Sequence, residues 1–315
     1  MEAPWQPDSP VLLGIGNGVL VCKAHGRVVC AQCCVDYSFT LDQSDDGVET
    51  TGLARVVNDE DEEWDAEGEG EEADLMLQML LGNQSMTRAK LQYRDDGTLI
   101  IPAIRSFVPP SPTSTPQQLF PLRHLPDRQY PRFTDRSDHG TLLIYTDGAC
   151  LNNGQTDPAA GWGFVFRDPE PDRPEVGRVS GRLEDHGPSG KPHPQTSNRA
   201  ELRAVIAVLR FRAWFGEGWT RLVIATDSEY VTRGATEWVR TWGRNGWVTS
   251  NRTAVKNRDL WEELLGELIG YRERGMEICF WRIPRAWNSE ADRIAKIGAR
   301  EERCRDFSAI MGVLT

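Results

Sequence analysis

The second half of the chain alternates between short apolar runs and longer amphipathic stretches. Five runs rich in β-branched and aromatic residues predict strands: TLLIYTD at 141–147, GWGFVFR at 161–167, EVGRVSGRL at 175–183, RLVIATD at 221–227 and MEICFWRI at 276–283. The first three follow one another through short connections. That order indicates an antiparallel meander.

Helical periodicity separates these runs. In SNRAELRAVIAVLRFRA, at 197–213, an apolar face contains Leu202, Val205, Ile206 and Leu209. Further helices are expected after residue 227, at 257–275 and at 289–302. The order of elements predicts an α/β fold, a mixed five-stranded sheet with helices on both faces.

The remaining chain divides by composition. We expect a small β-rich segment with a Cys/His cluster at 1–57, an acidic and proline-rich linker, mostly disordered, at 58–140, the α/β domain at 141–303, and a tail at 304–315. Residues 58–74 carry eleven carboxylates and no basic residue, and residues 102–140 contain eight prolines. Between them, an Asp96-Gly97 pair predicts a short hairpin.

The formal net charge of -11 argues at first against a nucleic-acid partner. Residues 1–140 hold 11 Lys and Arg against 23 Asp and Glu, whereas residues 141–315 hold 25 against 24. The acidity belongs to the N-terminal part, so the domain itself is free to bind a polyanion.

Four acidic residues follow the expected elements in a regular way. Asp147 and Asp227 end two strands, whereas Glu201 and Asp292 lie in early turns of two helices. Any one of them alone is typical of a cap or a solvated charge. If the four converge at one edge of the sheet, they need cations to remain ionised together. Hard oxygen ligands without nearby His or Cys favour Mg²⁺ or Mn²⁺ over zinc.

The sequence context of these acids is specific. YTDGAC, TSNRAEL, ATDSEY and NSEADRIAK, in this order, resemble the four signature blocks of type 1 ribonuclease H, over roughly half of the chain. The resemblance implies hydrolysis of the RNA strand of RNA/DNA hybrids, leaving 5'-phosphate products. It also implies that the four acids hold two Mg²⁺ ions, one for the attacking water and one for the leaving oxygen.

The resemblance also suggests substrate contacts. Asn153, Ser197 and Asn198 match positions that contact ribose 2'-hydroxyls in the family, although turn and cap roles explain the asparagines as well. Residues 235–261 interleave tryptophans with basic residues and are similar to the family's basic protrusion. We expect Trp238 and Trp261 to pack inward. The residues expected to face substrate are Arg244, Trp247 and Lys256.

One connection departs from the family pattern. Many type 1 enzymes carry a histidine in a flexible loop between the last strand and the last helix, whereas here the connection is PRAWN, residues 284–288. Arg285 offers positive charge there but does not shuttle protons at neutral pH.

The N-terminal cluster Cys22, His25, Cys30 and Cys33 has the ligand types and number of a structural zinc site, with Cys34 as a spare. Buried thiols in a small hairpin are the alternative. The spacing therefore predicts one Zn²⁺ without excluding free cysteines.

The chain shows no signal-peptide pattern, no membrane span and no disulfide framework, so we expect a soluble monomer of a reducing compartment. Cytosol, nucleus and mitochondrion are equally compatible with it, and no protein partner is indicated. Two other functions remain open. Beside a hybrid ribonuclease, the alternatives are an inactive nucleic-acid-binding or docking module and a nuclease for another RNA-containing duplex.

Overall fold

The computed structural model describes residues 89–310 except Gln129, Pro171, Pro174, Glu175 and Ala309. It also describes four two-residue strands near the N-terminus, β1 (Val11–Leu12), β2 (Leu20–Val21), β3 (Val29–Cys30) and β4 (Val35–Asp36). β1 pairs with β2 and β3 with β4, both antiparallel. The acidic tract 58–74 lies outside the described residues.

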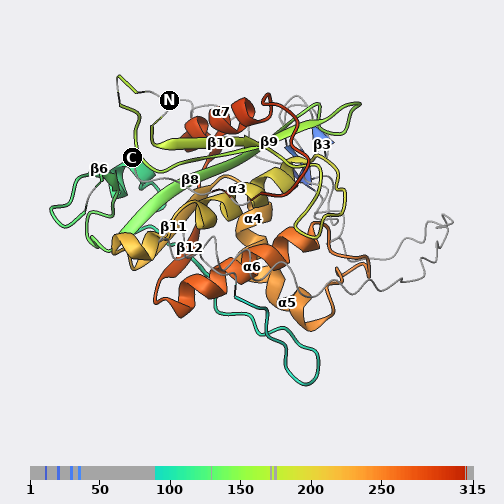
Figure 1. The fold of residues 1–315 in the computed structure, drawn as a ribbon. Helices are drawn as coiled ribbons and strands as arrows, with labels where there is room; N and C mark the ends of the chain where they lie inside the picture. Colours follow the sequence, from blue (N-terminus) through green and yellow to red (C-terminus); the bar gives the residue numbers. More distant parts are fainter. Residues whose placement is uncertain are drawn as a thin grey trace, which may run out of the picture. The chain divides into compact units, whose positions relative to one another are not determined.

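A six-stranded sheet forms the centre of the domain, in the order β10-β9-β8-β11-β12-β5 (Figure 1). Its strands are β8 (Thr141–Leu151), β9 (Ala159–Val165), β10 (Arg178–Arg182), β11 (Arg221–Thr226), β12 (Glu277–Arg282) and β5 (Arg105–Ser106). The predicted meander is confirmed, because β8, β9 and β10 pair antiparallel. β11 lies parallel to both β8 and β12. The predicted strand number was one too low, because β5 comes from a segment whose prolines suggested a linker.

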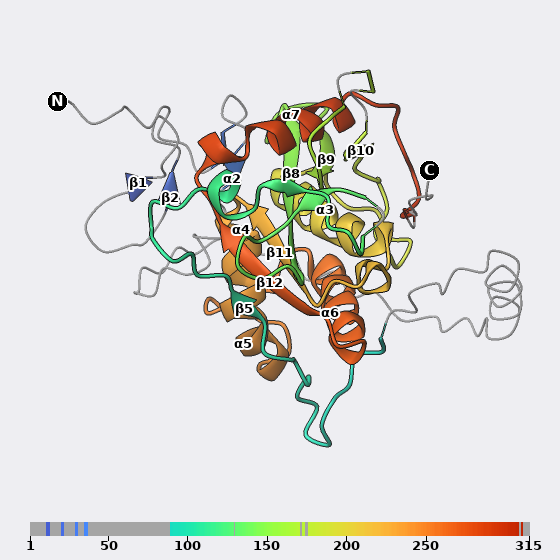
Figure 2. The ribbon, with the colours of Figure 1, turned by 90° about the vertical axis from the view of Figure 1, so that its left-hand side faces the viewer.

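The helices lie where the periodicity placed them. They are α3 (Ser197–Phe211), α4 (Glu229–Arg233), a π-helical turn (Gly234–Trp238), α5 (Val239–Arg244), α6 (Arg258–Glu273) and α7 (Ser289–Gly298). Figure 2 shows α7 on one face of the sheet and α3 with α6 on the other, as predicted. Within the described part of the chain, no helix is both long and apolar enough to cross a membrane.

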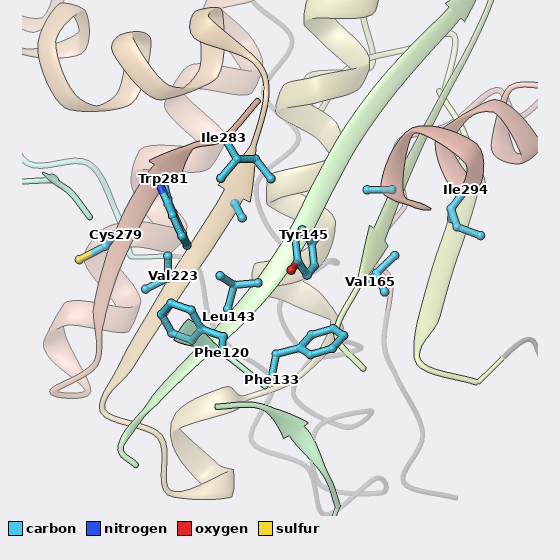
Figure 3. Close-up of a cluster of buried hydrophobic side chains, with 12 residues drawn as sticks. Phe120, Phe133, Leu143, Tyr145, Val165, Val223, Cys279, Trp281, Ile283 and Ile294 are labelled. Carbon is cyan, nitrogen blue, oxygen red and sulfur yellow. The ribbon is translucent and has the colours of Figure 1, made fainter. Parts of the chain in front are cut away.

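Residues 102–140 do not form the disordered linker that their prolines suggested. They contain α2 (Pro116–Leu119), β6 (Leu122–Arg123) and β7 (Arg132–Phe133). Phe120 and Phe133 are buried in one cluster with Leu143, Tyr145 and Trp281 (Figure 3). Burial of these rings supplies the apolar area that orders a segment rich in turns.

The ends of the domain also extend beyond the predicted limits. The predicted hairpin at Asp96-Gly97 is confirmed, with Gly97 at a φ of 78° and a bridge between Tyr93 and Leu99. After residue 303, the carbonyls of Cys304 and Arg305 accept hydrogen bonds from Asp185 and His186. At least the first part of the predicted tail is therefore packed on the domain.

Two glycines let α7 approach the sheet closely. A Cβ atom at Gly161 in β9 would lie 2.0 Å from the backbone nitrogen of Ala299, and one at Gly163 would lie 2.7 Å from that of Ala295. The helix backbone thus rests directly on β9. This contact fixes the C-terminal half of α7, and the same helix carries Asp292 in its first turn.

Candidate active site

The parallel pairing of β8 and β11 places two of the acids side by side. Tyr145 pairs with Ala225, so that Asp147 and Asp227, each two residues further on, reach neighbouring positions. Asp227 follows directly after β11. Asp147 does not close its strand, as the sequence suggested, because β8 continues to Leu151 and pairs Asp147 with Gly163 of β9.

Glu201 and Asp292 reach the same region from two helices. Their negative charges, together with that of Asp227, raise the pKa of Asp147, although burial of Asp147 is the largest cause. The Asp147 carboxyl is buried, with 7% exposure, and its pKa is well above the usual range. The four predicted acids therefore share one electrostatic site.

Asp227 experiences opposing influences. Burial raises its pKa, whereas the charge of Arg285 and a hydrogen bond from Asn288 lower it, and the net direction is upward. The Asn288 amide nitrogen donates to Asp227 Oδ1 at 2.7 Å and to the carbonyl of Thr146 at 3.0 Å. Asn288 thus ties the interior of β8 and the residue after β11 to the start of α7.

Two cations contact the fourth acid. Arg285 donates to Asp292 Oδ1 at 3.1 Å, and Lys296 donates to Oδ2 at 2.7 Å. Arg285 stands in the short PRAWN connection, which forms a 3-10 helix (Arg285–Trp287). The connection without histidine therefore delivers positive charge to the acidic site.

The position of Glu201 is set by a close contact and a hydrogen bond. The Ser228 hydroxyl donates to Glu201 Oε2 and also accepts from the backbone of Val231, capping α4. The α3 backbone at Glu201 lies directly against Gly148 of β8. Glu201 is in this way fixed relative to both Asp147 and Asp227.

The residues predicted to contact ribose are close in sequence to two of the acids: Asn153 follows Asp147, and Ser197 and Asn198 precede Glu201. The Asn153 amide nitrogen donates to the Ser197 hydroxyl at 3.2 Å, which joins the turn after β8 to the start of α3. Both side chains and that of Asn198 are buried. Asn153 and Ser197 are thus hydrogen-bonded to each other, and Asn198 follows Ser197 in the chain. The polar groups of all three are largely covered.

The protrusion, residues 235–261, only partly follows its prediction. Trp261 is buried as expected, Trp238 is half-buried, and Arg244 and Lys256 are exposed. Trp247, which was expected to face substrate, is buried with 4% exposure, so that prediction was wrong.

The reason lies in the backbone of the protrusion. The Trp247 amide donates to Trp242 and its carbonyl accepts from Val255, which turns the indole inward. Arg258 lies over the buried ring, with its guanidinium carbon 5.5 Å from the ring centroid. The exposed face of the protrusion is therefore basic rather than aromatic.

Among the described residues, no three or more His, Cys, Asp or Glu side chains are arranged to hold a metal ion as they lie. The bonds from Asn288, Arg285 and Lys296 occupy carboxylate oxygens of Asp227 and Asp292. The structure does not describe the side chains of the predicted zinc cluster, Cys22, His25, Cys30 and Cys33.

Three residues of the site were missed from the sequence, namely Ser228, Asn288 and Lys296. Each stands inside or next to a quoted block, since Ser228 follows Asp227 and Asn288 begins NSEADRIAK. Asn288 stands at the N-cap position of α7, yet its side chain makes no capping bond and binds Asp227 instead.

Fold and site together define an α/β protein with a carboxylate-based centre at the meeting point of two parallel strands. A family model described as RNase H matches residues 139–278, which include Asp147, Glu201 and Asp227 but end before Asp292. A ribonuclease H of Treponema pallidum is 40% identical over 164 residues, covering 51% of this chain and 92% of that protein. Another, from Anaplasma marginale, is 40% identical over 160 residues, covering 49% and 88%. The chain belongs to the ribonuclease H family.

Solved structures similar to this chain include RNase H1 of the archaeon Halobacterium salinarum and LC9-RNase H1. The first has 24% identity, a TM-score of 0.32, and coverage of 50% of this chain and 96% of that one. The second has 28% identity, a TM-score of 0.36, and coverage of 50% and 72%. These scores are too low to add to the sequence relationship.

Proposed function

We propose that this chain is an endoribonuclease that hydrolyses the RNA strand of RNA/DNA hybrids and leaves 5'-phosphate products. The observation that carries the proposal is the set of Asp147, Glu201, Asp227 and Asp292 in one electrostatic site, in a chain of the ribonuclease H family. A module used only for docking does not need to bury carboxylates that raise one another's pKa.

The donor set fits Mg²⁺ or Mn²⁺, because it offers only hard oxygen ligands and an excess of buried negative charge. When bound, two such ions would activate the attacking water and stabilise charge on the leaving 3'-oxygen. Loading requires Asp292 to turn from its present partners. Arg285 and Lys296 are long side chains able to move aside at small cost.

The chain's own residues perform the remaining tasks. Ser228 and Gly148 fix Glu201, and Asn288 fixes Asp227, so the carboxylates need little reorganisation along the strand ends. Arg285 keeps positive charge beside Asp292. We assign phosphate contacts to the exposed Arg244 and Lys256, and ribose recognition to Asn153, Ser197 and Asn198.

The decisive experiment compares labelled RNA/DNA, RNA/RNA and DNA/DNA duplexes, each with Mg²⁺, with Mn²⁺ and with chelator. We expect metal-dependent cleavage of RNA in the hybrid alone, with 5'-phosphate ends on the products. Equal cleavage of RNA/RNA would assign the other duplex as substrate. Binding of the hybrid without cleavage would favour the docking module.

We also propose that Cys22, His25, Cys30 and Cys33 bind one structural Zn²⁺. The support is their ligand chemistry and the two pairs, each with two intervening residues, separated by a short loop. This site shares no residue with the acidic site.

A further inference from the structure

We propose that residues 92–107, here called the brace, position the protrusion relative to the sheet and so set how well the enzyme holds its substrate. This inference rests on the proposed function, because it assigns a role in substrate binding to the protrusion. The brace lies outside residues 139–278, the part matched by the family model. It is therefore an addition to the matched domain.

One end of the brace contacts α5 of the protrusion. The amide of Leu99 donates to the carbonyl of Gly243 at 3.1 Å, and Leu99 is buried with 4% exposure. A Cβ atom at Gly243 would lie 2.8 Å from Ile101 Cδ1 and 3.2 Å from Leu99 Cβ. A glycine inside a helix costs about 1 kcal/mol relative to alanine. The close contact with the brace explains why a glycine occupies position 243 inside α5.

The other end of the brace is anchored in the sheet. β5 pairs parallel with β12, with Arg105 opposite Cys279, and Figure 2 shows β5 beside β12. The Phe107 amide donates to the carbonyl of Phe280 at 2.8 Å. The Phe107 ring lies 4.9 Å from the ring of Trp281 and 5.5 Å from that of Phe120. This end is therefore part of the hydrophobic core.

The N-terminal part of the brace, which contains Leu99, is a short hairpin. The Ile100 amide donates to the carbonyl of Gln92, and the Arg94 amide donates to that of Thr98, both at 2.8 Å. Ladder bonds across a tight turn make this piece stiffer than a free loop. The hairpin holds Leu99 against α5, and residues 101–104 join it to β5, so the brace links the position of β12 to that of α5.

Charge argues that the brace acts through position rather than through phosphate binding. Its charged residues are two basic and two acidic, namely Arg94, Asp95, Asp96 and Arg105. The residue next to the contact, Arg244, is exposed on α5 and is one of the proposed phosphate ligands. The brace thus positions Arg244, a cation that belongs to α5.

The test compares Leu99→Ala with Ile100→Ala in the full chain, because Ile100 is the adjacent apolar residue but has 43% exposure. We expect Leu99→Ala to raise KM for an RNA/DNA hybrid about tenfold, with kcat nearly unchanged. Hydrogen exchange at the amides of 239–244 should accelerate in the same variant. Ile100→Ala should behave as the parent in both measurements.

The dependence of binding on salt separates position from charge. If the brace only positions the protrusion, removing its exposed hairpin cation in Arg94→Ala leaves the slope of log Kd against log salt as in the parent, because no phosphate contact is lost. A reduced slope in Arg94→Ala would overturn the proposal by showing that the hairpin itself contacts phosphates. Unchanged KM together with unchanged exchange at 239–244 in Leu99→Ala would also overturn it.

A second pair of variants avoids a large cavity. Gly243→Ala should raise KM by displacing the brace, and Ile101→Val in the same chain should restore part of the loss by removing the closest atom. Absence of any such rescue would contradict the contact. If the parent cleaves no hybrid, the proposed function fails, whereas the exchange measurement still decides whether the brace holds α5.

Discussion

Gly148 and Glu201 meet backbone to backbone, since a Cβ atom added to Gly148 would lie 2.1 Å from the amide nitrogen of Glu201. The contact brings α3 onto β8 one residue after Asp147. The distance between Asp147 and Glu201 thus depends on the absence of a side chain at Gly148.

Gly148→Ala is expected to separate α3 from β8 and to lower both stability and cleavage. Overpacking of this kind costs about 1 to 3 kcal/mol, and the loss of activity should exceed the loss of folded protein because Glu201 shifts. Thermal unfolding and hybrid cleavage, measured together, check this. Gly190→Ala is the control, because a Cβ atom at Gly190 would meet nothing within 4 Å, although its φ of 74° predicts mild strain. Parent-like cleavage by Gly148→Ala would contradict the contact.

Replacing Asp147 by Asn should reduce hybrid cleavage by about 10³-fold or more, because the amide keeps the shape but removes the charge that holds cations. Asp227→Asn should do the same. In chelator, the Asp147→Asn protein should be more stable than the parent by about 1 kcal/mol or more, since a buried repelled charge is gone. Near-parent turnover in either variant would end the assignment of these acids to catalysis.

The stability gained by Asp147→Asn should depend on pH. Burial and neighbouring carboxylates raise the pKa of Asp147 in the folded chain above its ordinary value of 3.8. The ionised carboxyl therefore opposes folding above the folded-state pKa, and this cost falls as pH drops towards 3.8. The difference in unfolding free energy between variant and parent, measured in chelator, should be largest near neutral pH and shrink in acid. A stability difference that grows in acid would contradict a raised pKa of Asp147 as its cause.

We expect the acidic tract 58–74 to compete with nucleic acid for the basic protrusion. Removal of residues 1–88, which leaves the brace and the packed segment before β8 in place, should tighten hybrid binding about three- to tenfold at low salt. The gain should vanish at high salt because screening removes it. Binding that is unchanged at low salt would make the tract a spacer.

For the N-terminal cluster, purified protein should contain one zinc per chain by elemental analysis. Changing Cys22 and Cys30 together to Ser should remove the zinc and make the region before residue 50 sensitive to protease, because zinc supplies about 10 kcal/mol in small domains. Hybrid cleavage should persist, since the acidic site shares none of these ligands. Zinc-free parent protein would favour the buried thiols instead.

The sequence predicted what depends on periodicity and missed what depends on distant contacts. The strands from 141 onwards, the helices and the four acids all follow local patterns. β5 is two residues long and is ordered by pairing with the distant strand β12, so no local signal marks it. Trp247 lies beside cations in the sequence, but its ring direction depends on a backbone bond to Val255 that spacing does not show.

The pairing of β5 with β12 has a consequence for any shortened form of the protein. A chain begun at residue 139, where the family match starts, would lose β5 and leave amides and carbonyls of β12 without strand partners. Such an edge, beside the apolar Ile278 and Phe280, is a template for pairing with another molecule. The minimal domain drawn from its relatives is therefore expected to self-associate, whereas a chain that begins at residue 89 keeps the edge closed.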